Sequence, residues 1–389
     1  MNSRSFTTAA AIGWAFTGLI ASASSRFAPF ALVTLEERYD DDRLFQIENG
    51  GKGQFISKVS PQLGFQLDAP TLTVRPWYAA DIYERRLTTL KVDHRGELML
   101  KKQFFRRFST GALLKVWRVT DPTTLPRLGL ARTLSPVLYG TAKVEFSQRL
   151  TRLWEIHPVY RFEGAQVDEF DPSTGVNRPP GFYHSPSIES WWTLSARSAV
   201  GVEYRFQQFN YGQDTAHSQG GFVDLRYFFT PQVSFTAKAG PALYSQQGTR
   251  DSGSGVLPRV YLELILKDRW SELNVVAGHD LVGASGFTSV VWANFASAVA
   301  TFTFYGPFSL FGEASFFSNG KLSNSTLLTF QSPDSSKGYV LGGGVEFKVN
   351  NYVKLQGAFL RIAQFATANV LNLNLDRNVG SVRLVLSAW

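Results

Sequence analysis

The sequence predicts an all-β protein, a transmembrane antiparallel up-and-down β-barrel of about 18 strands. Three observations lead to this fold class. Hydrophobic residues recur at every second position along the chain, and the part that follows the N-terminal segment has no sustained 3.6-residue period of a helix. The alternating stretches are long, and short connections between them alternate with longer polar ones.

The alternation separates an apolar face from a charged face. In the stretch 199–211, Val202 and Tyr204 alternate with Glu203 and Arg205. Because successive side chains of a strand point to opposite sides, such a sheet has one apolar and one charged surface.

Strand length favours a membrane location. Strands in soluble proteins are most often about five or six residues long, whereas a tilted strand that crosses a bilayer needs roughly 9–11. Most of the alternating stretches here reach that length. We expect strands at 31–39, 54–67, 71–83, 90–101, 108–119, 134–147, 152–163, 185–194, 199–211, 219–229, 233–245, 256–266, 270–281, 288–304, 308–318, 338–348, 352–365 and 380–389.

The connections support the same conclusion. Those after every second strand are short, and the others are longer on average, the longest being 120–133, 164–184 and 319–337. Outer-membrane barrels have this asymmetry, with short periplasmic turns and longer extracellular loops. Loops 164–184 and 319–337 are each long enough to fold into the lumen as a plug or constriction, and each could equally lie on the outer surface.

Composition fits an exported barrel. The chain has 33 Gly, 32 Phe, 14 Tyr and 9 Trp, which suit tight turns and pleated surfaces, and it has no Cys. The absence of cysteine excludes disulfides and thiolate metal sites. The net charge of +8 is spread along the chain, so we expect no nucleic-acid partner.

The N-terminus has the pattern of a secretory signal peptide. Arg4 precedes an apolar run from Ala9 to Ala21, and Ala21-Ser22-Ala23 forms a small-x-small cleavage site. The run is shorter than the roughly 20 residues of a membrane-spanning helix. We therefore expect a signal peptide at 1–23 and a barrel at 24–389, located in the Gram-negative outer membrane.

Aromatic residues cluster beside the short connections, as expected of an interfacial girdle. They are Phe104, Phe105, Phe146, Trp154, Trp191, Trp192, Phe228, Phe229, Phe235, Trp270, Phe304, Tyr305, Phe347 and Tyr352. The final Trp389 resembles the C-terminal assembly signal of bacterial outer-membrane barrels. We expect membrane lipid and the barrel-assembly machinery as partners.

Two regions resemble the β-barrel porin 2 family of Gram-negative outer-membrane proteins. Residues 32–67 contain Tyr39, the acidic run 40–42 and a strand with Val59, Pro61 and Leu63; residues 75–115 are similar to the next hairpin of that family. Asp42 departs from the family pattern, which has Asn there. The resemblance covers about the first third of the chain and implies a role beside exopolysaccharide machinery, with a periplasmic polysaccharide-export protein as a partner.

The charged face should line a wet lumen. Either its charges pair between neighbouring strands, or they create a transverse field that orients a permeating solute. The predicted pore-lining residues are Arg75, Lys91, Asp93, Arg95, Glu97, Lys143, Glu145, Glu155, His157, Arg161, Glu203, Arg205, Asp224, Arg226, Arg259 and Glu263.

No pattern indicates catalysis. The five histidines are scattered, without H-x-x-x-H or H-E-x-x-H spacing, and neither G-x-S-x-G nor a P-loop occurs. Gly342, Gly343 and Gly344 indicate a bend or bulge within a strand. We expect no catalytic residue, no metal site and no cofactor.

The leading functional hypothesis is a porin-like conduit associated with exopolysaccharide export. A diffusion porin for general or small solutes is the first alternative. A structural or adhesive surface protein, or a barrel enzyme, is the second.

Overall fold

A computed structural model describes most of the predicted barrel. The described residues are 25–41, 53–85, 89–120, 137–167, 170–171, 176–177, 180–211, 214–247, 253–283, 290–304, 306–321, 335–367 and 375–388. The predicted signal peptide, Trp389, most of loops 120–133 and 319–337, and part of loop 164–184 lie outside them.

Eighteen strands form one sheet, and the remaining two, β8 and β9, form a separate short hairpin. The sheet strands are β1 (Arg26–Asp40), β2 (Gln54–Ala69), β3 (Leu72–Arg85), β4 (Thr89–Phe105), β5 (Phe108–Val119), β6 (Val137–Arg149), β7 (Trp154–Val167), β10 (Gly181–Thr193), β11 (Ser198–Tyr211), β12 (Asp214–Thr230), β13 (Val233–Gln247), β14 (Gly253–Lys267), β15 (Ser271–Gly283), β16 (Val290–Thr303), β17 (Phe308–Lys321), β18 (Ser335–Lys348), β19 (Val353–Thr367) and β20 (Leu375–Ala388). The hairpin joins β8 (Phe170–Asp171) to β9 (Val176–Asn177).

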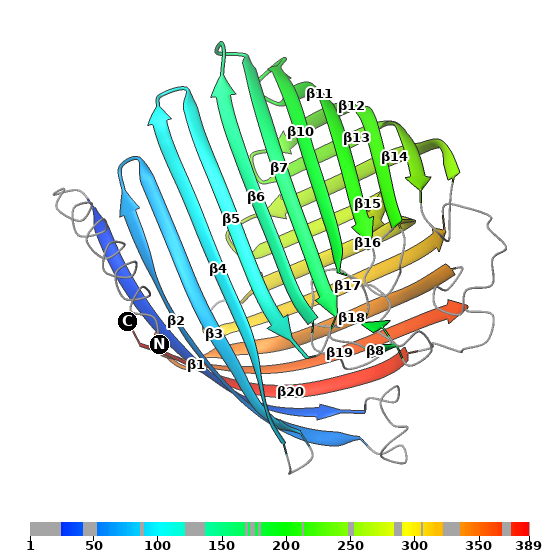
Figure 1. Cartoon of the computed structure of the whole chain (residues 1–389). Helices are drawn as coiled ribbons and strands as arrows, with labels where there is room; N and C mark the ends of the chain where they lie inside the picture. Colours follow the sequence, from blue (N-terminus) through cyan, green and yellow to red (C-terminus); the bar gives the residue numbers. More distant parts are fainter. Residues whose placement is uncertain are drawn as a thin grey trace, which may run out of the picture.

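The sheet closes on itself, which confirms the predicted fold class. Strand β1 pairs antiparallel with β2 on one side and with β20 on the other, so that Leu35 lies opposite both Val59 and Leu384. Consecutive strands pair all the way round, and Figure 1 shows them winding into a tilted barrel with β1 beside β20. Because the sheet is closed, each of its described strands has a neighbour on both sides, as a membrane-spanning sheet requires.

The outer face of the barrel is apolar and exposed. Val223 is 67% exposed and Leu243 is 52% exposed. Val223 lies opposite the similarly exposed Val202 of β11. A contiguous apolar surface of this kind is stable against lipid rather than water. The chain is therefore a transmembrane β-barrel. The described residues include no helix that could cross a membrane.

The aromatic girdle beside the short turns is largely as predicted. Phe105 is 74% exposed, and Trp192 stacks on Trp154 with ring centroids 6.1 Å apart. Trp191 corrects the prediction, because it is only 6% exposed and lines an internal cavity. Two consecutive residues of a strand face opposite sides, so only one of this tryptophan pair can face lipid.

The glycine run of β18 is not a bulge. Its register continues unbroken on both sides, with Gly343 opposite Gly312 of β17 and Phe359 of β19. The missing side chain permits close packing instead: a Cβ atom on Gly344 would lie 2.2 Å from the carbonyl oxygen of Gly357. Of the predicted bend or bulge, the bulge is absent, because the glycines permit a close approach by the next strand that a local glycine pattern does not reveal.

Candidate functional site: the lumen wall and its two cavities

The predicted pore-lining residues all occupy strand positions on the face opposite the exposed apolar band. Lys143 and Glu145, for example, flank the outward-facing Val144, which lies opposite Tyr160 of the lipid-facing surface. Arg75 lies 5.7 Å from the ring of the inward-facing Phe30. The remaining residues occupy equivalent positions on β4, β6, β7, β11, β12 and β14.

One group of ion pairs lies where the barrel closes. Asp40 of β1 and Arg377 of β20 are 1% and 2% exposed, and the Nη2 of Arg377 lies 2.6 Å from Oδ2 of Asp40. Four residues earlier in β1, Glu36 pairs with Lys58 of β2 at 2.6 Å and with Arg383 of β20 at 3.2 Å. These contacts join the first, second and last strands of the sheet.

A second group crosses β10 to β13. The Nζ of Lys238 lies 2.9 Å from Glu189, 2.8 Å from Glu203 and 3.6 Å from Asp224. Because each partner belongs to a different strand, this single ammonium holds four neighbouring strands together. Glu203 also accepts a 2.6 Å hydrogen bond from Nε of Arg205.

The second group continues to β15, where the wall bends inward. Asp280 pairs with Arg259 and lies 3.6 Å from Arg205. The β14–β15 pairing runs only as far as His279. Beyond it Leu281 is 2% exposed and packs in a buried cluster with the inward-facing Phe209 and Ala216, so this strand end lies against the inner wall.

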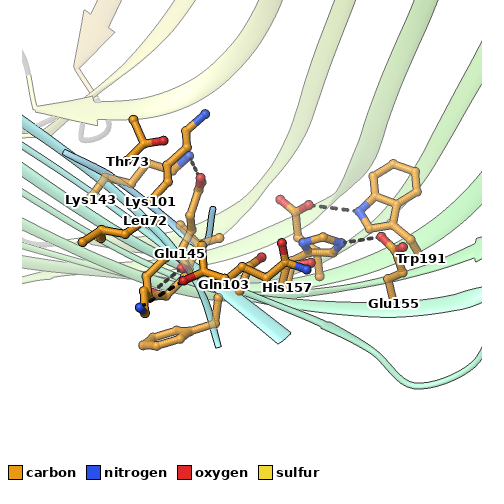
Figure 2. A pocket seen from close by; sticks show the side chains of 18 of the residues that line it. Leu72, Thr73, Lys101, Gln103, Lys143, Glu145, Glu155, His157 and Trp191 are labelled. Atoms are coloured by element: carbon orange, nitrogen blue, oxygen red, sulfur yellow. Dashed lines mark hydrogen bonds and ion pairs between the residues drawn. The ribbon is translucent and has the colours of Figure 1, made fainter. Parts of the chain in front are cut away.

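One cavity of about 640 Å³ lies at the end of the lumen that carries the short turns. We call it the short-turn cavity. Its wall includes Lys143, Glu145, Glu155, His157 and Trp191, which Figure 2 shows directed into one space. The ring nitrogen Nε2 of His157 lies 3.3 Å from Glu155, and Lys143 pairs with Glu145.

A second cavity of about 640 Å³ lies farther from the short turns. We call it the loop-side cavity. One part of its wall carries the ion pairs of β1 and β20 and the 2.7 Å pair between Arg95 and Asp81. The other part is apolar and glycine-rich, formed by β16 to β19 with Phe311, Leu360 and others.

Some charged residues that line the two cavities form no ion pair with another described residue. Among the described residues, Lys101, Arg161 and Arg226 line the short-turn cavity, are exposed to it and form no ion pair with a carboxylate. In the loop-side cavity the corresponding residue is Glu313. The formal balance of lumen charges is therefore mixed, whereas the charge available to a solute in the short-turn cavity is positive.

Sequence reasoning missed several residues of the lumen. Lys101, Glu189 and Glu313 occupy inward positions within the predicted strands 90–101, 185–194 and 308–318, so the same alternation could have found them. Asp40 and Arg377 are different, because 337 positions separate these partners and no local pattern pairs them. Within the described ranges no group of His, Asp and Glu has metal-binding geometry.

Comparison with known proteins finds similarity to solved structures at low sequence identity. No family model matches the chain, so the resemblance to the β-barrel porin 2 family is still a prediction, and no curated protein matches. Among solved structures, Pseudomonas aeruginosa OccK2 (OpdF) in complex with glucuronate is 10% identical, with 93% of this chain and 98% of that chain covered and a TM-score of 0.47.

Two further structures are similar to the same extent. The outer-membrane protein opdK of Pseudomonas aeruginosa is 10% identical over 92% of this chain and 99% of that chain, with a TM-score of 0.45. Acinetobacter baumannii OccAB4 is 12% identical over 93% and 98%, with a TM-score of 0.43. Likeness at this level assigns neither a family nor a solute.

Proposed function

We propose that the protein is a passive channel for small solutes across the outer membrane, and not an enzyme. The observation that carries this proposal is the charged lumen of an 18-stranded barrel, whose wall lines two cavities of about 640 Å³ each. Barrels of roughly 16–18 strands enclose an aqueous channel unless a plug fills it. Cavities of this size suit solutes of a few tens of atoms.

Polysaccharide export, the leading hypothesis from the sequence, has no support among the described residues. A polymer in transit needs a wide, continuous bore. Here inward-facing charged residues such as Asp224 and Glu203 are 0% and 2% exposed, so side chains and the inward-bent end of β15 fill part of the bore. The small-solute alternative fits this geometry better.

Conductance and solute flux test the proposal. The refolded protein in planar bilayers should give discrete current steps in KCl. Proteoliposomes should swell quickly in arabinose, more slowly in a disaccharide and not at all in a dextran of several kilodaltons. Absence of current at every voltage would exclude an open channel, and dextran flux equal to that of arabinose would restore the export hypothesis.

A further inference from the structure

The carboxylates of the short-turn cavity are all paired. Each acidic residue that lines it has a basic partner within salt-bridge distance. The pairs are Glu145 with Lys143, Glu155 with Arg149 and His157, and Glu189 with Lys238. Every carboxylate of the described cavity wall is therefore engaged by a cation, and Lys238 shares its single charge among Glu189, Glu203 and Asp224.

The same wall also carries basic residues that have no carboxylate partner among the described residues. Lys101 of β4, Arg161 of β7 and Arg226 of β12 reach the cavity from three different strands. None of them contacts a carboxylate within the described part of the chain. Lys102, nearer the turn, donates a 3.3 Å hydrogen bond to the hydroxyl of Thr71 and carries no paired carboxylate either.

Arg226 is held in place by stacking rather than by an ion pair. Its guanidinium lies 4.4 Å from the ring centroid of Trp191. The indole lies flat against β11 at Gly201, where a Cβ atom would come within 2.9 Å of the ring, and its Nε1 donates a 3.1 Å hydrogen bond to Glu189. Cation–π stacking fixes the plane of a guanidinium while leaving its N–H edge free for a ligand.

We infer that the short-turn cavity is a binding site for small oxyanionic solutes, carboxylates and phosphates, with Lys101, Arg161 and Arg226 as the binding residues. Guanidinium groups bind both oxyanions through paired N–H donors, and the ammonium of Lys101 adds a point charge. The inference rests on the proposed channel function and adds a substrate class to it. It also gives the channel a preference for anions over cations.

Ion selectivity tests the inference. The zero-current potential in a KCl gradient measures the chloride-to-potassium permeability ratio, and added succinate or inorganic phosphate should reduce the chloride current by occupying the site. One charge about 6 Å from an ion changes its local concentration in water roughly threefold. The double variant Arg161→Gln/Arg226→Gln should therefore lower the permeability ratio, and weaken block by both anions, roughly tenfold.

Arg269→Gln is the matched control. Arg269 also stacks on a tryptophan, at 4.7 Å from Trp270, but it belongs to a short turn outside the cavity. Its replacement should leave selectivity and block at the wild-type values. The charge-conserving variant Arg161→Lys/Arg226→Lys should keep the selectivity but weaken block by succinate, because the paired donors are lost.

The outcomes separate the two proposals. A folded protein without current overturns the channel function itself. Current whose selectivity and succinate block are the same in wild type and in the glutamine double variant overturns only the anion site. Block by phosphate but not by succinate would restrict the site to phosphates and contradict the broader class. Heat-dependent migration in gels verifies that each variant has formed a barrel before its current is measured.

Discussion

Replacing Val223 with arginine should destabilise the barrel by about 2–4 kcal/mol, because this side chain faces the middle of the bilayer. Val223 is 67% exposed, and the aromatic Tyr227 and Phe229 of the same strand mark the interface at the short turns. A strand residue rises about 3.4 Å, or roughly 2.6 Å along the membrane normal at a tilt of about 40°. Four residues therefore place Val223 roughly 10 Å above Tyr227, near the centre of an apolar band about 25 Å tall.

Reversible urea unfolding in lipid vesicles, followed by tryptophan fluorescence, measures this loss of stability. Ser315→Arg is the control, because Ser315 lines the loop-side cavity two residues from Glu313 and its replacement puts arginine in a wet lumen beside a carboxylate. The control should lie within about 1 kcal/mol of the wild type. If Ser315→Arg destabilises the barrel as much as Val223→Arg, the assignment of outer and inner faces is wrong.

Three other substitutions test separate parts of the structure. Gly240→Ala should cost about 1–3 kcal/mol in urea unfolding, because its Cβ atom would lie 2.0 Å from the carbonyl oxygen of Gly221, whereas Gly221→Ala meets nothing within 4 Å and should be neutral. Arg377→Ala should cost about 3–5 kcal/mol, since it leaves a buried carboxylate without its main partner; a loss below 1 kcal/mol in the same assay would contradict this. The pKa of Asp268 lies below its ordinary value of 3.8 because the backbone N–H of Trp270 donates to it, so the stabilisation is present above about pH 4 and disappears as the pH falls through the lowered pKa. The difference in melting temperature between wild type and Asp268→Asn should therefore shrink from pH 6 to pH 3, and a constant difference would refute the assignment.

The face of each strand was predictable because it depends on alternation alone. A two-residue period assigns a side chain to lipid or lumen without knowledge of its neighbours, and Val223 and Asp224 show how sharply the pattern separates the two. The strand ends were less predictable. Strand β12 begins at Asp214, five residues before the predicted start at 219, because outside the bilayer both faces of a strand meet water and the alternation disappears.

The arrangement of charges within the lumen was not predictable. Lys238 contacts Glu189, which is 49 residues away in the sequence, and Arg226 stacks on Trp191, which is 35 residues away. These contacts depend on the curvature of the wall and on glycines such as Gly201 that let side chains lie flat. The sequence therefore indicated a mixed lumen, and only the pairing in three dimensions distinguishes neutralised charges from those available to a solute.

The ion pair between Asp40 and Arg377 constrains the order in which the strands come together during barrel assembly. It closes a loop of 337 residues, and the entropy of bringing such distant segments together costs roughly 5 kcal/mol for a flexible chain. This contact can therefore form only after the intervening hairpins have zipped together and delivered β20 to β1. The last step of assembly is then also the step that brings Arg377 to Asp40, so an unfinished barrel exposes unpaired backbone groups at its open edges, while Asp40 keeps its contact with Arg38 of the same strand.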